Sequence, residues 1–194
     1  PEKVQDCLDA LPYRCADGHL SARAALRDNM AHCFDGSLLA AAALRRAGLS
    51  PALVDLCAVR DDDHMICTFR WKGRWGAVAK SNFPGLRFRE PIYRSVRELA
   101  LSYFEFYFNM EGEKSLRHFS RPFELPDPSK INWETDDSKG DQIVALLSGA
   151  LTDGDGLLEP EVGDASDQLL EDPSVANPRV NHCNGVNRHH ANVS

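Results

Sequence analysis

The stretch that decides the fold is AHCFDGSLLAAAALRRAG, residues 31–48. Ala and Leu favour helices, and Gly48 suits the left-handed position that follows a helix C-terminus. Arg45 and Arg46 stand in the last turn, where positive charge complements the helix dipole. We therefore predict a helix that begins at Cys33 and ends just before Gly48, and the small alanines allow other elements to pack close to its axis.

Cys33 is the first candidate for a chemically active residue. The first turn of a helix carries unpaired backbone N–H groups and partial positive charge, which lower the pKa of a thiol held there. We therefore expect a Cys33 thiol with a lowered pKa, able to act as a nucleophile. The alternative is a small buried side chain without a chemical role.

Composition excludes several classes of function. The chain has 194 residues and a net charge of -7, which argues against a nucleic-acid partner. The longest apolar runs are shorter than the roughly 18 residues that span a membrane. The six cysteines show no CxxC pair, and we expect no export signal, so reduced thiols in the cytoplasm are predicted. We expect no cofactor.

The rest of the chain alternates helical and strand patterns. Helical spacing of apolar residues predicts helices at 1–11 and 20–27 and a short one at 142–147. A capping box at Ser95 and Glu98 predicts a further helix that runs to about Asn109. Strand patterns cover 51–59, 64–71, 74–80 and part of 115–125. From about residue 126 the composition turns polar, so we predict a domain at 1–125 and an acidic, largely irregular tail at 126–194.

The hairpin around Lys72-Gly73 supplies Cys33 with a base. A loop of two or four residues places Ser81 directly across from His64, and a three-residue loop shifts the partner to Lys80 or Asn82. An oxygen of Asn82 or Ser81 can then accept a hydrogen bond from one ring nitrogen of His64, while the other nitrogen faces a thiol.

The order of these residues resembles the transglutaminase-like, papain-like cysteine superfamily. The pattern Cys-x-Asp-x-x-x-Leu-x-x-x-x-Leu-Arg-x-x-Gly from Cys33 is similar to its nucleophile segment, and a strand, a strand-initial His64, Trp75 and a polar segment at 80–82 follow in the same order. The resemblance covers about residues 20–110. It implies an α+β fold, papain/transglutaminase-like, with the central helix starting at Cys33 packed against a small antiparallel sheet. His32 stands where the family usually has Gly, and no Asp occupies the third position.

The resemblance also implies a chemistry. Cys33 attacks an amide or ester carbonyl, His64 carries the proton, Asn82 orients His64 with Ser81 as second choice, and the Cys33 N–H stabilises the oxyanion. The reaction would be peptide or isopeptide hydrolysis or transfer on a protein or peptide. The alternative function is a non-catalytic binding or regulatory module that uses the same cleft.

Three further groups of residues are candidates for binding roles. A metal site from His32, Cys33, His64 and Cys67 is disfavoured because His64 and Cys67 are three apart on a strand and point to opposite faces. Asp61, Asp62 and Asp63 are expected in a solvated turn. The basic residues of the segment 80–97 form either a solvated face or a site for an acidic peptide, phosphate or carboxylate. These residues are Lys80, Arg87, Arg89, Arg94 and Arg97.

Overall fold

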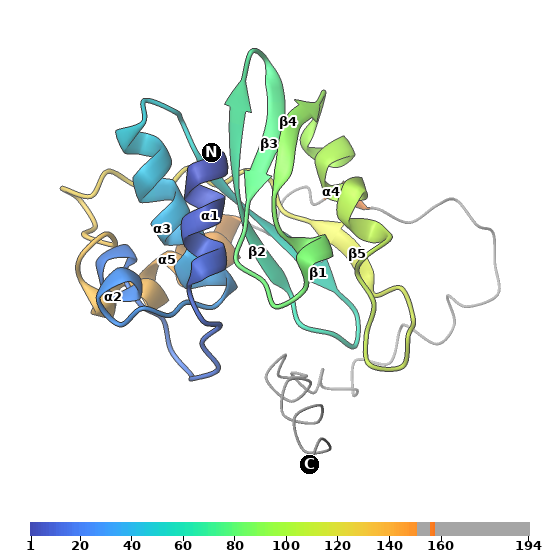
Figure 1. Ribbon diagram of the computed structural model, residues 1–194, viewed down its shortest axis with the longest axis horizontal. Coiled ribbons are helices and arrows are strands. Elements are labelled where there is room, and N and C mark those ends of the chain that lie inside the picture. The colour runs from blue at the N-terminus through green and yellow to red at the C-terminus, as the bar shows by residue number, and fades with distance from the viewer. Residues whose placement is uncertain (151–155, 158–194) are drawn as a thin grey trace.

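The protein is a mixed α+β structure in which helices cover both faces of one antiparallel sheet (Figure 1). The computed structural model describes residues 1–150 and 156–157. Within these residues the helices are α1 (Glu2–Ala10), α2 (Ala22–Arg27), α3 (Cys33–Arg46), α4 (Val96–Phe104) and α5 (Gly140–Ala150), with short 3-10 turns at Pro84–Leu86 and Asp137–Lys139.

The sheet has the strand order β4-β3-β2-β1-β5-β6, and all paired neighbours are antiparallel. The β2–β3 hairpin closes through a two-residue turn at Lys72 and Gly73, whose φ angles of 48° and 78° are those of the turn that fits twisted strands. The hairpin prediction is thus confirmed. The strands are β1 (Ala52–Ala58), β2 (His64–Trp71), β3 (Arg74–Val78), β4 (Arg89–Tyr93), β5 (Leu116–Phe119) and β6 (Gly156–Leu157).

The helix predicted from Cys33 is confirmed, and it begins with a capping box. The His32 Nδ1 accepts hydrogen bonds from the N–H groups of Phe34 and Asp35, at 3.1 and 3.3 Å, while the Asp35 carboxylate accepts one from His32 N–H. These bonds satisfy N–H groups that would otherwise lack partners at the helix start. Gly48 follows the helix with φ +79°, the left-handed value expected there.

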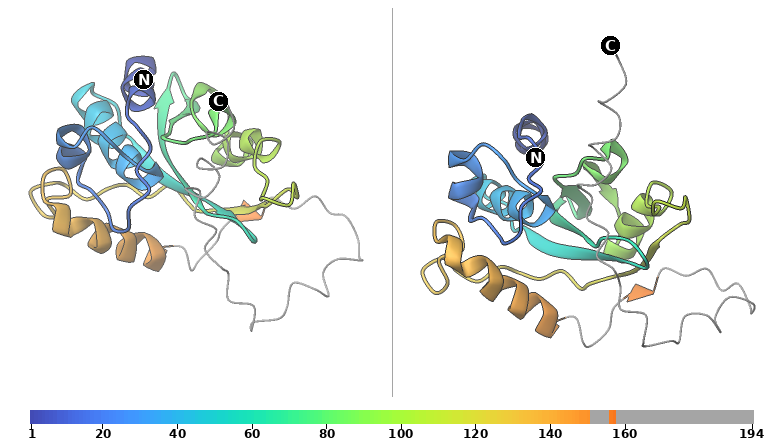
Figure 2. Two further views of the ribbon diagram at one scale, coloured as in Figure 1. Left: turned by 60° about the horizontal axis from the view of Figure 1, so that its bottom comes forward. Right: turned by 90° about the horizontal axis from the view of Figure 1, so that it is seen from below.

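The core lies in two layers, one on each face of the sheet. On one face α1, α3 and α5 pack around Leu38, Met65 and Phe69, and on the other α4 packs around Ile66 and Tyr103. Figure 2 shows the sheet between these helices from two further directions. Alternate residues of β2 therefore face different helices, as the two-residue period of a strand requires.

The packed core extends past the boundary predicted at residue 126. Trp133, Ile143 and Leu147 are all buried and belong to the same cluster as Leu38. The short helix expected at 142–147 is present as α5, and it contributes this apolar face. Residues 126–136 are irregular, as predicted for the tail, but Trp133 and α5 pack on the core, which the prediction confined to residues 1–125; apart from the two residues of β6, the chain beyond Ala150 lies outside the described residues.

Two smaller expectations need correction. The helix α4 ends at Phe104, not near Asn109. Reduced thiols are found at Cys7, Cys33, Cys57 and Cys67, whereas Cys15 is disulfide-bonded. Every helix in residues 1–150 is too short or too polar to cross a lipid bilayer.

Candidate functional site

Cys33 is the first residue of α3, and its sulfur lies against the start of β2. The backbone N–H groups of Met65 and Phe34 lie close enough to the Cys33 sulfur to lower the pKa of its thiol. One turn later the Ser37 hydroxyl donates to the Met65 carbonyl at 3.0 Å. The first two turns of α3 are thus fixed to the backbone of Met65, the residue that follows His64 in β2.

A glycine allows α3 to approach the end of the hairpin. A Cβ built on Gly36 would lie 2.4 Å from the Cβ of Lys80, a separation that side-chain atoms do not tolerate. The Lys80 side chain is anchored in turn, because its ammonium donates to the carbonyls of Leu8 and Leu11 at the end of α1. The helix that carries Cys33 therefore packs directly on the 80–82 segment.

Burial determines the protonation of Cys33. It raises the pKa of the thiol to about 11, and the Asp55 and Asp35 charges also raise this pKa, whereas the two N–H groups at the sulfur lower it. The lowered pKa expected from the helix start is wrong, because desolvation of the thiolate outweighs the N–H groups of the first turn. Cys33 rests as a protonated thiol and needs a base in order to react.

Tyr13 contacts Cys33 through its hydroxyl group. The Cys33 backbone N–H lies close enough to the Tyr13 hydroxyl to lower the pKa of that hydroxyl, whereas the Cys33 side chain raises it. Tyr13 follows α1 in an irregular segment, tied to the chain next to α3 by a bridge with Ala31. Sequence reasoning did not find Tyr13, because it lies in a break without helical or strand periodicity.

His64 is the first residue of β2 and is buried. Its Nε2 lies 2.8 Å from the Leu86 carbonyl oxygen in the 3-10 turn after β3. Because a carbonyl oxygen only accepts hydrogen bonds, the neutral ring carries its proton on Nε2 and its lone pair on Nδ1. The ring is thus held in one tautomer, with Nδ1 as the basic atom.

The paired register of the hairpin stops before the polar segment 80–82. The β2–β3 register ends at Cys67↔Val78, and when extended it puts Ser81 across from His64. The Ser81 hydroxyl accepts a hydrogen bond from the Phe83 N–H at 3.1 Å. The Asn82 Nδ2 is buried without a hydrogen-bond partner among the described residues. The bond that orients His64 Nε2 comes from Leu86, so the role of Asn82 stays a prediction.

The acidic turn before β2 is packed into the protein and not simply solvated. Asp61 is buried, and its carboxylate accepts a hydrogen bond from the Ser115 hydroxyl at 2.6 Å. The Tyr107 hydroxyl donates to the Asp62 carbonyl at 2.5 Å. Burial and the neighbouring carboxylates raise the pKa of Asp63. These contacts fix the end of the turn that presents His64.

Two groups of side chains near the site offer donor atoms of the kinds that bind metals. They are His19, His32 and Asp35, and Asp55, Cys57 and Asp63, with donor atoms within 4.8 Å of one another in each group. In the first group His32 Nδ1 already accepts hydrogen bonds from backbone N–H groups, and its Nε2 lies 3.1 Å from the Gly18 carbonyl oxygen. A neutral His32 thus has no lone pair left for a metal.

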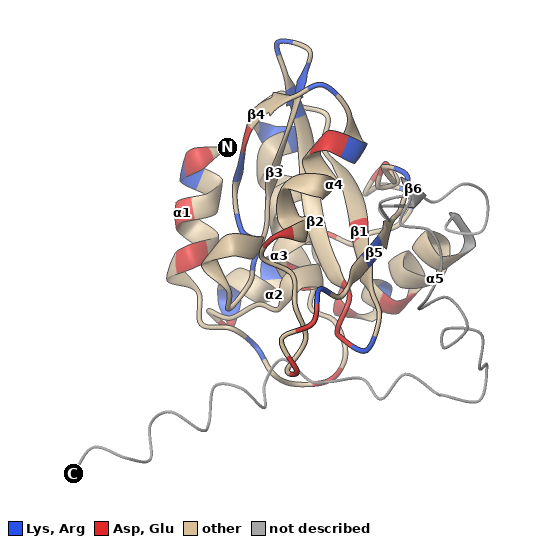
Figure 3. Ribbon diagram, turned by 90° about the vertical axis from the view of Figure 1, so that its right-hand side faces the viewer, with Lys and Arg blue, Asp and Glu red and all other residues tan. Residues whose placement is uncertain are grey.

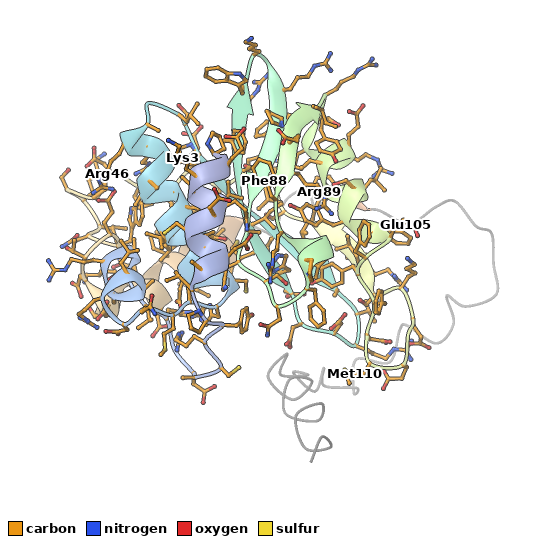
Figure 4. All side chains as sticks on the ribbon, viewed as in Figure 1. Lys3, Arg46, Phe88, Arg89, Glu105 and Met110 are labelled. Carbon is orange, nitrogen blue, oxygen red and sulfur yellow. The ribbon has the colours of Figure 1, made fainter. Side chains whose placement is uncertain are left out.

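Most of the basic run serves internal contacts. Lys80 is anchored on α1, as described above. Arg87 donates to the Ser81 carbonyl at 2.9 Å and lies 3.2 Å from the Asp9 carboxylate. Arg89 lies 3.9 Å from the centre of the Tyr103 ring and bonds Ser102 on α4 (Figure 4). The expected anion site therefore does not extend over these three residues, because their charged groups hold the hairpin end against α1 and α4.

Comparison with known proteins assigns no family. No model of a known protein family matches the chain, and no curated protein matches it either.

Proposed function

We propose that Cys33 is the nucleophile of a thiol-dependent acyl transfer, in a domain of the transglutaminase-like, papain-like type. The observation that carries the proposal is the closeness of the Cys33 sulfur to the backbone of Met65, the residue that follows His64, whose Nε2 is held by the Leu86 carbonyl. In this proposal Cys33 is the thiol, His64 is the base that takes its proton, and the Leu86 carbonyl is the group that orients the base.

The reaction begins when a substrate carbonyl displaces the Tyr13 hydroxyl from the Cys33 N–H. His64 Nδ1 takes the thiol proton while the sulfur forms a bond to the carbonyl carbon, and the carbonyl electrons move to its oxygen. The Cys33 N–H, which Tyr13 occupies at rest, then stabilises that oxyanion. A raised thiol pKa makes this base essential, because little thiolate exists at neutral pH.

The second half of the reaction releases the product. The oxyanion collapses and expels the amine, which takes the proton from His64, and a thioester of Cys33 remains. Water or an amine then attacks the thioester, loses its proton to His64, and the Cys33 sulfur leaves and regains that proton. Attack by water gives peptide or isopeptide hydrolysis, and attack by an amine gives transglutamination. The substrate in either case is a protein or peptide. Asn82 assists the His64 ring in this scheme.

A cytoplasmic location is part of the proposal. It is supported by free thiols at Cys7, Cys33, Cys57 and Cys67. The disulfide bond of Cys15 counts against a reducing compartment. A maleimide count of free thiols in protein taken directly from its native cell decides between a reducing and an oxidising compartment. Reactive Cys15 would support the cytoplasm, and unreactive Cys15 would contradict it.

A non-catalytic binding or regulatory module is the second candidate. Two observations favour it, namely the protonated thiol of the half-buried Cys33 and the position of the Tyr13 hydroxyl beside the N–H that an oxyanion would need. In such a module these groups would hold the fold together and would not react.

Alkylation of Cys33 separates the two candidates. Iodoacetamide is reacted with the wild type, Tyr13→Phe and His64→Gln, and the modified cysteine is identified by peptide mass spectrometry. The enzyme proposal predicts faster alkylation of Cys33 in Tyr13→Phe and a loss of about tenfold or more in His64→Gln. Equal rates of Cys33 alkylation in the wild type and His64→Gln would reject His64 as the base and favour the non-catalytic module. Alkylation of the exposed Cys7 serves as the internal reference.

A further inference from the structure

The outer end of the β2–β3–β4 part of the sheet carries a surface that the proposed reaction does not use. Residues directly opposite one another in neighbouring strands share a face, and Trp71 is paired with Arg74. The β3–β4 register pairs Trp75 with Tyr93, the last residue of β4, so Arg74 and Arg94, the neighbours of that pair, lie at the same end of the two strands. Trp71, Arg74 and Arg94 therefore lie together at the outer end of the three strands.

Exposed apolar side chains accompany these arginines. Trp71 is 54% exposed, and Ile92, two residues before Arg94 on the same side of its strand, is 66% exposed. Arg74 and Arg94 are exposed as well. We call Trp71, Arg74, Ile92 and Arg94 the hairpin surface. Figure 3 shows Lys and Arg residues gathered at the tip of this hairpin.

The guanidinium groups of the hairpin surface have no acidic partner among the described residues. Arg74 and Arg94 flank the same β3–β4 pair, Trp75 and Tyr93, and like charges placed so close together repel one another. Within residues 1–150 neither forms an ion pair. Lys72 adds positive charge at the tip, against the single carboxylate of β4, Glu90. This local excess stands out in a chain of net charge -7.

We propose that the hairpin surface binds an acidic peptide segment that carries apolar side chains. Guanidinium groups bind carboxylates through two parallel hydrogen bonds, and a carboxylate between Arg74 and Arg94 would relieve their repulsion. Trp71 and Ile92 supply the apolar contacts that hot spots of protein interfaces require. A peptide lying across the three strands meets both kinds of group.

Two other anionic partners fit the surface less well. A single-stranded nucleic acid stacks successive bases on several aromatic rings, and Trp71 is the one exposed aromatic residue of the hairpin. A membrane anchor needs its apolar residues at the projecting tip, but the tip is Lys72-Gly73 and the apolar residues lie behind it on the sheet face.

The hairpin surface is separate from Cys33. It lies at the far end of β2 from His64, and seven residues of strand at about 3.3 Å each put roughly 23 Å between the two ends. Binding at the hairpin surface is therefore expected to persist in Cys33→Ala, so the proposal succeeds or fails independently of the proposed reaction.

Peptide binding to the full chain tests this proposal. The probe is a fluorescein-labelled peptide in which Glu alternates with Leu, and fluorescence anisotropy gives the dissociation constant at low and at high salt. We expect about tenfold weaker binding for Arg74→Glu and for Arg94→Glu, and weaker binding for Trp71→Ala. The control is Arg23→Glu, an identical charge change at an exposed position of α2, which should bind within about twofold of the wild type once surface charge is screened.

Several outcomes would overturn the proposal. If Arg23→Glu weakened peptide binding as much as Arg74→Glu does, the loss of affinity would follow from net charge alone and not from the hairpin surface. Binding of a peptide in which Lys alternates with Leu at the same affinity would remove the role of the arginines. Tighter binding to vesicles that contain phosphatidylserine, or to single-stranded poly(U), with the same dependence on Arg74 and Arg94, would assign the surface to those partners.

Discussion

Gly36→Ala tests the close packing that brings Cys33 to the hairpin. Helix propensity alone favours the substitution by about 1 kcal/mol, because alanine restricts the unfolded chain more than glycine does. The structure predicts the opposite sign. The new Cβ would lie 2.4 Å from the Lys80 Cβ, whereas ordinary van der Waals contacts begin at 3.4 Å, so α3 or the segment 80–82 must move by about 1 Å.

The magnitude follows from the cost of overpacking. Inserted methyl groups in tight cores cost about 1–3 kcal/mol, and Lys80 yields poorly because its ammonium is anchored on Leu8 and Leu11. After the gain in propensity, we expect Gly36→Ala to lower the free energy of unfolding by about 0–2 kcal/mol, which corresponds to a fall in Tm of up to roughly 8 °C.

Urea denaturation followed by circular dichroism measures this change. The matched control is Ala43→Gly in the same helix, at a half-buried position, which isolates propensity and should cost about 1 kcal/mol. A Gly36→Ala variant that is more stable than the wild type would refute the tight contact between α3 and Lys80, and with it the account of how Cys33 is positioned.

Three further predictions concern the core and the thiol. Ile143→Ala should lower the free energy of unfolding by about 2–5 kcal/mol, whereas Leu146→Ala, 42% exposed, should change it by about 0.5 kcal/mol or less; equal effects in urea titrations would remove α5 from the core. Arg14→Met should cost about 3–5 kcal/mol, because it leaves the buried Asp35 carboxylate without the guanidinium that lies 2.8 Å away; thermal denaturation that matches the wild type would contradict this. Alkylation of Cys33 should accelerate with pH up to about 11, since only the thiolate reacts, and a rate that levels off near 8.5, as for a free cysteine, would show an unburied thiol.

The sequence predicted the elements near Cys33 well, because their signals are local. Helix propensity and end residues marked α3, and the turn residues at Lys72-Gly73 marked the hairpin and its register. The core beyond residue 125 was missed because Trp133 stands alone among polar residues and prolines. Its burial depends on contacts with α3, where Arg45 lies over its ring, and on a bond from Nε1 to the Pro126 carbonyl.

The site was predicted less completely, for physical reasons. The partner of His64 Nε2 is the backbone carbonyl of Leu86. Because every residue carries a backbone carbonyl, no pattern of side chains in the sequence predicts this contact. The pKa of Cys33 depends on how deeply the thiol is buried, which a helix start does not reveal. Tyr13 lies in an irregular segment and meets the first residue of α3, and neither a helical nor a strand period relates two such positions.

Trapping an acyl-enzyme is the most direct test of the central claim, that Cys33 is a nucleophile served by His64. The protein is mixed with an activated ester, and intact mass followed by peptide mapping locates the acyl group. The account predicts one acyl group on Cys33, absent in Cys33→Ala and formed about 100-fold or more slowly in His64→Gln. Acylation confined to exposed Cys7, or a Cys33 rate that His64→Gln leaves unchanged, would contradict it.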